Sequence, residues 1–254
     1  SPLPKTSPAP ERRFRRAGTG FHCRGTWRPY TGLANKMKDQ RMRVSVALLL
    51  CLFLLPLPAA AQSHRSGVFD YYVLSLSWSP TWCALEGDAR DATQCDDAAD
   101  TGWVLHGLWP QYHRGWPEHC QSAHAPPTRA MTRAMADVMG SAGLAWYQWK
   151  KHGSCSGLSA ADYFALSRAA FDRLARPEVF RKLTKPVKLP AKVVEEAFLK
   201  ANPGLEPDML TITCREGRIQ EARLCLSRDL TPVPCGVDVV RDCAMRDALF
   251  DPIR

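Results

Sequence analysis

Eight cysteines between residues 83 and 243 are the feature that most restricts how this chain can fold. The 254-residue sequence holds ten cysteines, and the other two, Cys23 and Cys51, lie nearer the amino terminus. An even number of cysteines in an exported chain is typical of a disulfide framework, but eight cysteines allow 105 pairings, so their positions alone select none. The eight are Cys83, Cys95, Cys120, Cys155, Cys214, Cys225, Cys235 and Cys243.

A short apolar segment upstream indicates that the chain is exported. Met42-Arg43 is followed by an apolar run over residues 44–57 and by small residues that end at Ala61. This order is the layout of a secretory signal peptide over residues 42–61, with cleavage after Ala61. The run is shorter than the ~20 residues that span a bilayer, so a retained membrane anchor is the weaker alternative. We expect a secreted or periplasmic protein without stable membrane association after cleavage.

The positive charge of the chain lies upstream of the expected cleavage point. Residues 1–41 are rich in Pro, Arg and Gly without apolar periodicity, so we interpret them as a disordered or mistranslated leader, with a basic RNA-binding arm as the alternative. Residues 1–61 hold 11 of the 34 Lys and Arg and 2 of the 25 Asp and Glu, which accounts for the net charge of +9. Residues 62–254 therefore carry 23 of each sign, and phosphate binding there requires a local cluster.

Residues 62–254 are enough for a single domain with a substantial core. Aromatic and β-branched runs predict strands, and apolar residues at helical spacing predict helices. Because the two are mixed without strict alternation, we expect an α+β fold. Strands are expected over 69–78, 103–109, 209–214 and 218–226, helices over 128–140, 144–152, 159–175 and 190–201, and loops over 86–100 and 111–127.

Two segments place histidines among chemically useful neighbours. In WVLHGLWP, residues 103–110, a histidine leaves an apolar strand that we expect the proline to stop. In YQWKKHGSC, residues 147–155, helical spacing brings Gln148, Lys151 and His152 onto one face. That face presents an amide, a cation and an imidazole together.

Two histidines and a lysine suit RNA cleavage by transesterification. One imidazole takes the proton of the ribose 2′-hydroxyl and the other protonates the departing 5′-oxygen, and a histidine pKa of about 6.5 allows one neutral and one charged ring. An ammonium group can neutralise charge that develops on phosphorus. No metal or cofactor is required, and DNA lacks the 2′-hydroxyl. On the pattern alone, structural histidines and a solvated Lys150-Lys151 pair are the alternative interpretation.

Both segments resemble the active-site segments of the T2 family of secreted ribonucleases. HGLWP at 106–110, KHGSC at 151–155 and the strand YVLSLSW at 72–78 match in order and separation, and the similarity extends over 69–243. The resemblance implies an α+β fold around a central antiparallel sheet packed with several helices. It also implies a metal-independent endoribonuclease that cleaves single-stranded RNA to 2′,3′-cyclic phosphate and 3′-phosphate ends.

The resemblance also implies roles for individual residues. His106 and His152 would form the acid–base pair, in the family with the second histidine as base, although this sequence leaves the order open. Lys151 would stabilise the transition-state charge, and the Trp109 ring would help to hold a base by stacking. Independently of the resemblance, Tyr112 is a second candidate for stacking on a base, with an ordinary loop aromatic as the alternative. The implied disulfides are Cys83–Cys95, Cys120–Cys155, Cys214–Cys243 and Cys225–Cys235.

The second segment departs from the family pattern His-Glu-Trp-x-Lys-His at two positions. Tyr147 replaces a phosphate-binding histidine, and Gln148 replaces the acidic residue that polarises the site. Glutamine can donate a hydrogen bond to phosphate but has no negative charge, so the charged forms of Lys151 and His152 should be less favoured. The alternative function is therefore a catalytically weakened secreted protein that binds RNA or another partner on the same scaffold.

The remaining candidates have simpler explanations. We expect the histidines of the 111–127 loop to be exposed and several tryptophans to belong to the core. No Cys-x-x-Cys or His-x-x-x-His pair favours a zinc site, and we expect a monomer that binds RNA, not DNA, without a cofactor. The residues concerned are His113, His119 and His124 in the loop and Trp78, Trp103 and Trp149 in the core.

Overall fold

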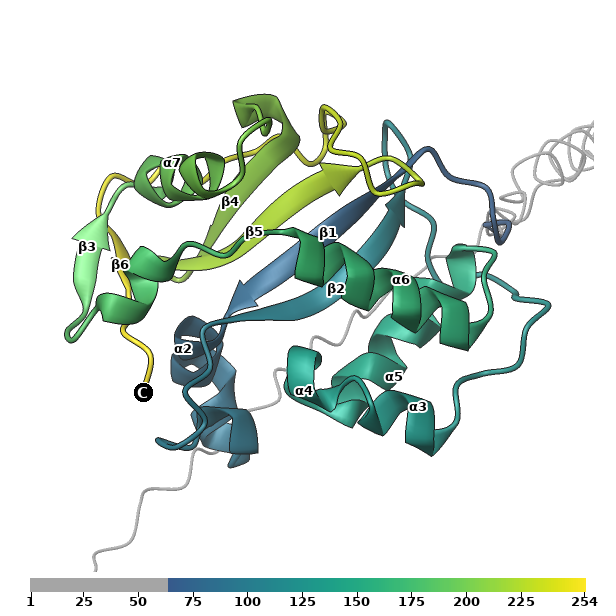
Figure 1. The fold of residues 1–254 in the computed structure, drawn as a ribbon, viewed down its shortest axis with the longest axis horizontal. Helices are drawn as coiled ribbons and strands as arrows, with labels where there is room; N and C mark the ends of the chain where they lie inside the picture. Colours follow the sequence, from purple (N-terminus) through teal and green to yellow (C-terminus); the bar gives the residue numbers. More distant parts are fainter. Residues whose placement is uncertain (1–63) are drawn as a thin grey trace, which may run out of the picture. The chain divides into compact units, whose positions relative to one another are not determined.

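The computed structural model describes residues 64–254 of the chain. The leader expected over 1–41 and the signal peptide expected over 42–61 lie outside these residues. The described part has one sheet with helices packed against it, which confirms the predicted α+β fold (Figure 1). Within it, no helix combines the length and the apolar character that crossing a membrane requires.

The sheet of the described region has six strands, built around three long ones. β1 (Tyr71–Trp78) lies between β2 (Trp103–Gln111) and β5 (Arg218–Leu226) and pairs antiparallel with both. β4 (Leu210–Arg215) pairs with β5 in an antiparallel hairpin. Its two-residue turn, Glu216-Gly217, has positive φ at both positions, as a type I′ turn requires.

Two short strands that the sequence pattern did not predict complete the sheet. β3 (Val187–Leu189) and β6 (Ala248–Phe250) pair antiparallel with each other, and a parallel bridge joins β6 to β5. Three residues are too few to show an alternating pattern. β2 also continues beyond the point where we expected Pro110 to stop it. An edge strand tolerates proline because one side needs no backbone donor, and β2 is at the edge of the sheet.

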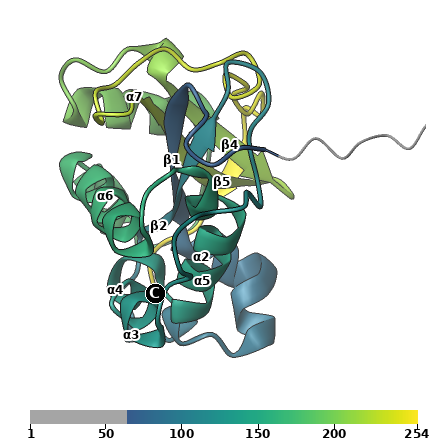
Figure 2. The same cartoon turned by 90° about the vertical axis from the view of Figure 1, so that its right-hand side faces the viewer.

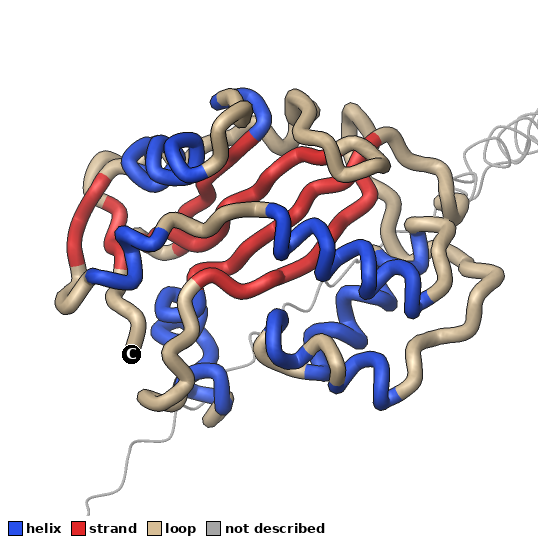
Figure 3. Tube along the Cα trace, viewed as in Figure 1, coloured by secondary structure: helices blue, strands red, loops and turns tan. Residues whose placement is uncertain are grey.

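The helices lie near their predicted positions, with one interruption. Figure 3 distinguishes the helices, strands and loops along the described chain. The single helix expected over 128–140 is two short helices, because the Ala134 carbonyl accepts a hydrogen bond from Arg168 instead of continuing the helical ladder. The expected 86–100 loop also begins with helical turns, η1 (Cys83–Gly87) and η2 (Asp88–Arg90). The helices are α2 (Ser79–Trp82), α3 (Arg129–Arg133), α4 (Ala136–Met139), α5 (Ala142–Lys151), α6 (Ala160–Arg173) and α7 (Ala191–Ala201).

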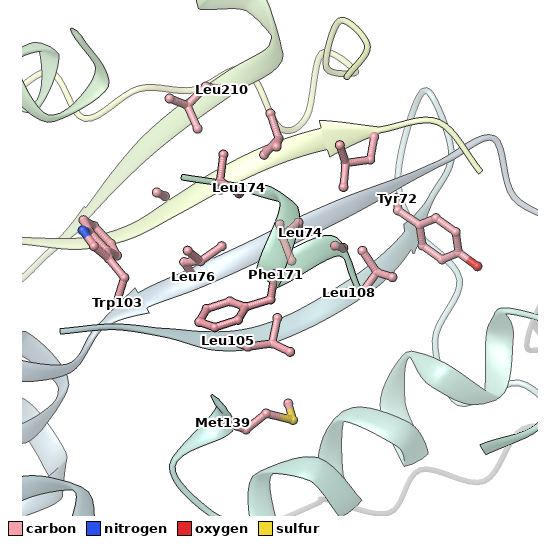
Figure 4. Packing of buried hydrophobic residues seen from close by; sticks show 14 of the residues in the cluster. Tyr72, Leu74, Leu76, Trp103, Leu105, Leu108, Met139, Phe171, Leu174 and Leu210 are labelled. Atoms are coloured by element: carbon pink, nitrogen blue, oxygen red, sulfur yellow. The ribbon is translucent and has the colours of Figure 1, made fainter. Parts of the chain in front are cut away.

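The main core lies between one face of the sheet and helices α6 and α7 (Figure 2). Tyr72, Leu74 and Leu76 point to this face from alternate positions of β1, where Phe171 of α6 packs against the sheet (Figure 4). Phe198 of α7 is fully buried in the same cluster. Burying a large apolar side chain stabilises a fold by about 1.5–3 kcal/mol, so this face holds the sheet and helices together.

Beyond Tyr71, the other face of β1 carries smaller side chains. Val73, Ser75 and Ser77 alternate with the core residues and therefore point away from the core. Ser75 pairs with residues of both neighbouring strands, β2 and β5. Its short side chain leaves space above the middle strand, where longer side chains from β2 and β5 can meet.

Four disulfides link the described cysteines in the pairs that the resemblance implies. One of them ties the loop after β2 to Cys155, in the short helical turn that directly follows α5 and ends the second histidine segment. This disulfide therefore helps to fix the positions of the two histidine segments relative to each other. The pairs are Cys83–Cys95, Cys120–Cys155, Cys214–Cys243 and Cys225–Cys235.

Candidate active site

His106 is an extra residue in the pairing of β2 with β1. Gly107 faces Ser75 and Leu105 faces Leu76, so His106 has no residue opposite it. A β-bulge of this kind turns the side chain of the extra residue away from the direction that regular strand alternation would give it. Here Leu105 remains in the core while the His106 side chain is 31% exposed on the open face.

The second histidine lies at the carboxyl end of α5. The Ser141 side chain caps the start of this helix by accepting from the Leu144 amide. The helix ends after Lys151, and Gly153 follows in close packing, since a Cβ there would lie 2.6 Å from Trp149 and 2.8 Å from Tyr163. The close packing around Gly153 holds the end of the helix against the core and keeps the preceding residue, His152, in a fixed position.

A cavity of about 320 Å³ lies between β2 and α5. It brings together side chains from both predicted segments, which are 38 to 46 positions apart in the sequence. Six of the predicted site residues line it: His106, Trp109, Tyr147, Gln148, Lys151 and His152.

The Trp109 indole contacts both histidine rings. His152 stacks on it with centroids 5.2 Å apart and planes at 27°, and His106 meets it edge-on at 5.2 Å and 80°. The indole Nε1 donates a 2.7 Å hydrogen bond to Gln148 Oε1. Trp109 therefore sets the spacing of the two imidazoles, a position that the sequence did not indicate.

Gln148 is a buried link between α5 and β2. Gln148 is only 1% exposed, although it forms part of the cavity wall. A Cβ at Gly107 would lie 2.4 Å from Gln148 Oε1 and 2.4 Å from Trp109 Nε1. Glycine at position 107 is therefore required for helix and strand to approach this closely.

His152 is held in its neutral form by its surroundings. It is 6% exposed, and burial, followed by the charges of Lys151, His106 and His119, lowers its pKa from 6.5 to about 3. Its Nδ1 atom has no hydrogen-bond partner among residues 64–254. A neutral imidazole that faces a cavity can accept a proton.

Lys151 and Tyr147 form the accessible rim of the cavity. The Lys151 side chain is 29% exposed, and its ammonium lies 3.7 Å from the Glu118 carboxylate. Tyr147 is 48% exposed and borders a second cavity of about 490 Å³ as well. The two cavities share His106, so open space continues on both sides of this residue.

Glu221 is a site residue that the sequence reasoning missed. It lies on β5, is 1% exposed, and its Oε1 is 2.5 Å from His106 Nδ1. Arg223 donates to Oε2 through Nε at 2.9 Å and Nη2 at 2.6 Å. Burial raises the pKa of Glu221, but the hydrogen bond and charge of His106, together with Arg223, outweigh burial and lower the pKa to about 2.

The other candidate residues lie away from the cavity or in the core. Tyr112 does not line the cavity; its ring packs against the hydrophobic core and lies 6.2 Å from the His64 ring. His124 is exposed in its loop, as expected, and the three tryptophans are buried in the main core. The tryptophans are Trp78, Trp103 and Trp149.

One group in the described region has side chains spaced closely enough for a metal ion. It consists of Cys83, Asp88 and Cys95. The two sulfur atoms are joined in a disulfide, so they are not thiolate ligands.

Comparison with known proteins gives one family for most of the described region. Residues 69–235 match the model of the Ribonuclease T2 family. A ribonuclease of Aeromonas hydrophila is 42% identical over 124 residues, which are 48% of this chain and 55% of that protein. A probable ribonuclease of Haemophilus influenzae is 36% identical over 121 residues, which are 42% of this chain and 44% of that protein. The chain thus spans about half the length of these bacterial relatives.

Solved structures with the same fold include an RNase-related protein from Calystegia sepium. It aligns with a TM-score of 0.55 at 18% identity and covers 75% of this chain and 98% of its own. At this identity the similarity concerns the fold alone. It agrees with the predicted arrangement of helices around an antiparallel sheet.

Proposed function

Because this chain belongs to the ribonuclease T2 family, we propose that it is an endoribonuclease that cleaves single-stranded RNA with His106 and His152 as its acid–base pair. One observation carries the proposal: two histidines from separate segments contact the same indole and face the same cavity. Lys151 supplies the cation at the wall of that cavity.

The different surroundings of the two histidines support an assignment of roles. His152 is buried and its pKa is lowered to about 3, so it is neutral in mildly acidic and neutral solution and serves as the base. His106 Nδ1 lies 2.5 Å from the Glu221 carboxylate, which can accept the Nδ1 proton and leave Nε2 to serve the substrate. His106 is therefore the acid.

The reaction needs only these groups. His152 takes the proton of the 2′-hydroxyl, the 2′-oxygen bonds to phosphorus, and the bond from phosphorus to the 5′-oxygen breaks as His106 delivers its proton. Lys151 stabilises the charge on the phosphoryl oxygens. The product carries a 2′,3′-cyclic phosphate, which water opens to a 3′-phosphate with the two roles reversed. No metal enters the scheme, and DNA is excluded because it lacks the nucleophile.

The proposed setting is the periplasm or the exterior of the cell. Four disulfides in residues 83–243 suit an oxidising compartment, and two of them link β4 and β5 to the segment that follows β5. The signal peptide over 42–61 would deliver the domain of 62–254 there as a monomer, free of the membrane after cleavage.

The experiment that tests the proposal is digestion of matched RNA and DNA strands in excess EDTA. Purified protein should cleave the RNA, leave the DNA intact and form ends that mass spectrometry identifies as 2′,3′-cyclic phosphates. His106→Ala and His152→Ala should each lower the rate by about 10²–10⁴-fold, the usual contribution of acid–base catalysis. The matched control is His124→Ala, an exposed loop histidine. Full activity in both active-site variants would exclude the proposal, and loss of activity in EDTA would exclude its metal-independent form.

A further inference from the structure

Glu221 is a buried carboxylate whose two oxygens both serve side chains of the site face. It lies on β5 and is 1% exposed, and an ionised carboxylate is costly to bury unless it is paired and hydrogen-bonded. Oε1 faces His106 Nδ1 at 2.5 Å, and Oε2 accepts two hydrogen bonds from Arg223. Arg223 alone could pair a structural glutamate; the contact of Oε1 with His106 needs a different explanation.

Several features of the sheet allow this contact. His106 and Glu221 lie on strands that are not neighbours, because β1 runs between β2 and β5. The strands on either side of β1 are about 10 Å apart, so the two side chains must meet above β1. Ser75 and Ser77, the residues of β1 beneath them, are small enough to leave that space.

Irregular pairing on both strands aims the two side chains at each other. His106 is the unpaired residue of the β2 bulge. On β5, Thr213 of β4 faces Glu221 and Cys214 faces Ile219, so Gln220 is likewise an extra residue. This shift places Ile219 in the core and Glu221 on the site face.

We propose that Glu221 is a positioning residue for His106: its carboxylate accepts the Nδ1 proton, turns Nε2 toward the cavity and stabilises the positive charge of the ring before proton transfer to the 5′-oxygen. This inference rests on the proposed function. A carboxylate behind a catalytic imidazole commonly fixes its tautomer and orientation in this way. The sequence has no acid at position 148, and β5 supplies one to the other histidine instead.

Other charged and titratable groups around His106 do not supply this contact. Glu86 of η1 lines the second cavity together with His106, but Arg215 and Arg90 already pair with its carboxylate. The cavity is also lined by Tyr147, Lys151 and His152 of α5, which have no carboxylate, and by Arg223 of β5. Asp238 lines it too, but its carboxylate accepts a hydrogen bond from the Gly115 amide. Glu221 is the carboxylate within hydrogen-bond distance of this ring in the described region.

The test uses two substrates that differ in their need for an acid. A single-stranded RNA oligonucleotide has an alkoxide leaving group that must be protonated, whereas uridine 3′-(4-nitrophenyl phosphate) releases a stable phenolate without a proton. Glu221→Gln should lower kcat on the oligonucleotide at least about 10-fold with KM nearly unchanged, and change the rate on the nitrophenyl ester by less than about threefold.

The control variant is Glu196→Gln, an exposed glutamate on α7, which should match the wild type on both substrates. Equal losses on both substrates in Glu221→Gln, or no loss on RNA, would overturn the proposal. If the wild-type protein cleaves RNA but the variant does not discriminate between the substrates, the proposed function stands and only the role of Glu221 fails.

A second measurement keeps the test decisive if either protein is inactive. Nitrogen-15 NMR of the histidine rings reports the tautomer of His106 directly, independent of turnover. The wild-type protein should carry a proton on Nδ1, and Glu221→Gln should lose that preference. An Nε2–H tautomer of neutral His106 in the wild-type protein would overturn the proposal, and thermal unfolding would show whether the variant is folded.

Discussion

The two halves of the site hold their histidines in opposite ways. On the sheet side, His106 is partly exposed and its Nδ1 meets a carboxylate that Arg223 anchors. On the helix side, His152 is buried against the Trp109 indole, and its Nδ1 lacks a hydrogen-bond partner among the residues that the structure describes. One half sets a carboxylate behind its imidazole and the other buries its imidazole in the neutral form, so the two rings have the different surroundings that an acid and a base require.

This difference gives a reason for the amide at position 148. A carboxylate there would lie close to Trp109 and to the helix face that carries His152, and a nearby negative charge favours a protonated imidazole. Gln148 keeps the hydrogen bond to Trp109 without adding that charge. The departure from the family pattern is therefore compatible with a neutral base at His152.

The largest expected effect beyond the histidines themselves is the loss of the cation on the helix side. Lys151→Ala should lower kcat by about 10²-fold or more, because the phosphoryl charge loses its stabilising ammonium. Steady-state cleavage of an RNA oligonucleotide measures this effect. Lys150→Ala is the matched control, since Lys150 is exposed and does not line the cavity. Comparable losses in the two variants would argue against a specific role for Lys151.

A smaller effect should follow from forcing the two halves apart. In Gly107→Ala, the added methyl would meet Gln148 and Trp109 at 2.4 Å, so we expect about 1–3 kcal/mol of destabilisation from overpacking and about 10-fold lower activity. Urea unfolding and RNA cleavage measure the two quantities. The control is Gly143→Ala in α5, where the Cβ meets only Ser141 Oγ at 3.9 Å. Unchanged stability in Gly107→Ala would contradict the close approach.

The smallest expected effect comes from adding a carboxylate to the helix side, near His152, as Glu221 provides one near His106 on the sheet side. Gln148→Glu should change the maximal rate by less than about fivefold but move the acid limb of the kcat/KM profile to higher pH, because the new negative charge favours protonated His152. Gln121→Glu, at an exposed loop position, is the control. An acid limb that stays in place would show that position 148 does not influence the base.

The sequence predicted the helix side of this site better than the sheet side. Gln148, Lys151 and His152 are close in sequence, so helical spacing alone places them together. Glu221 is 115 positions from His106, and their contact depends on strand order, on two irregular pairings and on the small Ser75 between them. The sequence did contain one indication: Glu221 and Arg223 are two positions apart in a strand that is otherwise largely apolar, so both point to the same face of the sheet. This spacing indicates an ion pair between them but does not indicate that His106 contacts Glu221.

The fold shows the same division between local and long-range information. The long strands and most helices have clear periodicity and lie where the pattern placed them. The break between α3 and α4 depends on Arg168, which is more than 30 positions away, and β3 with β6 depends on the completed sheet. Pairings of this kind need three-dimensional context.

The most direct test of the account is the NMR titration of His152. Its ring resonances can be assigned by their absence in His152→Ala and followed from neutral pH down to the acid limit of folding. Burial and the charges of Lys151, His106 and His119 lower its pKa to about 3, so the ring should remain neutral at pH 5. A midpoint near the ordinary histidine value of about 6.5 would contradict the assignment of His152 as a neutral base held ready by burial.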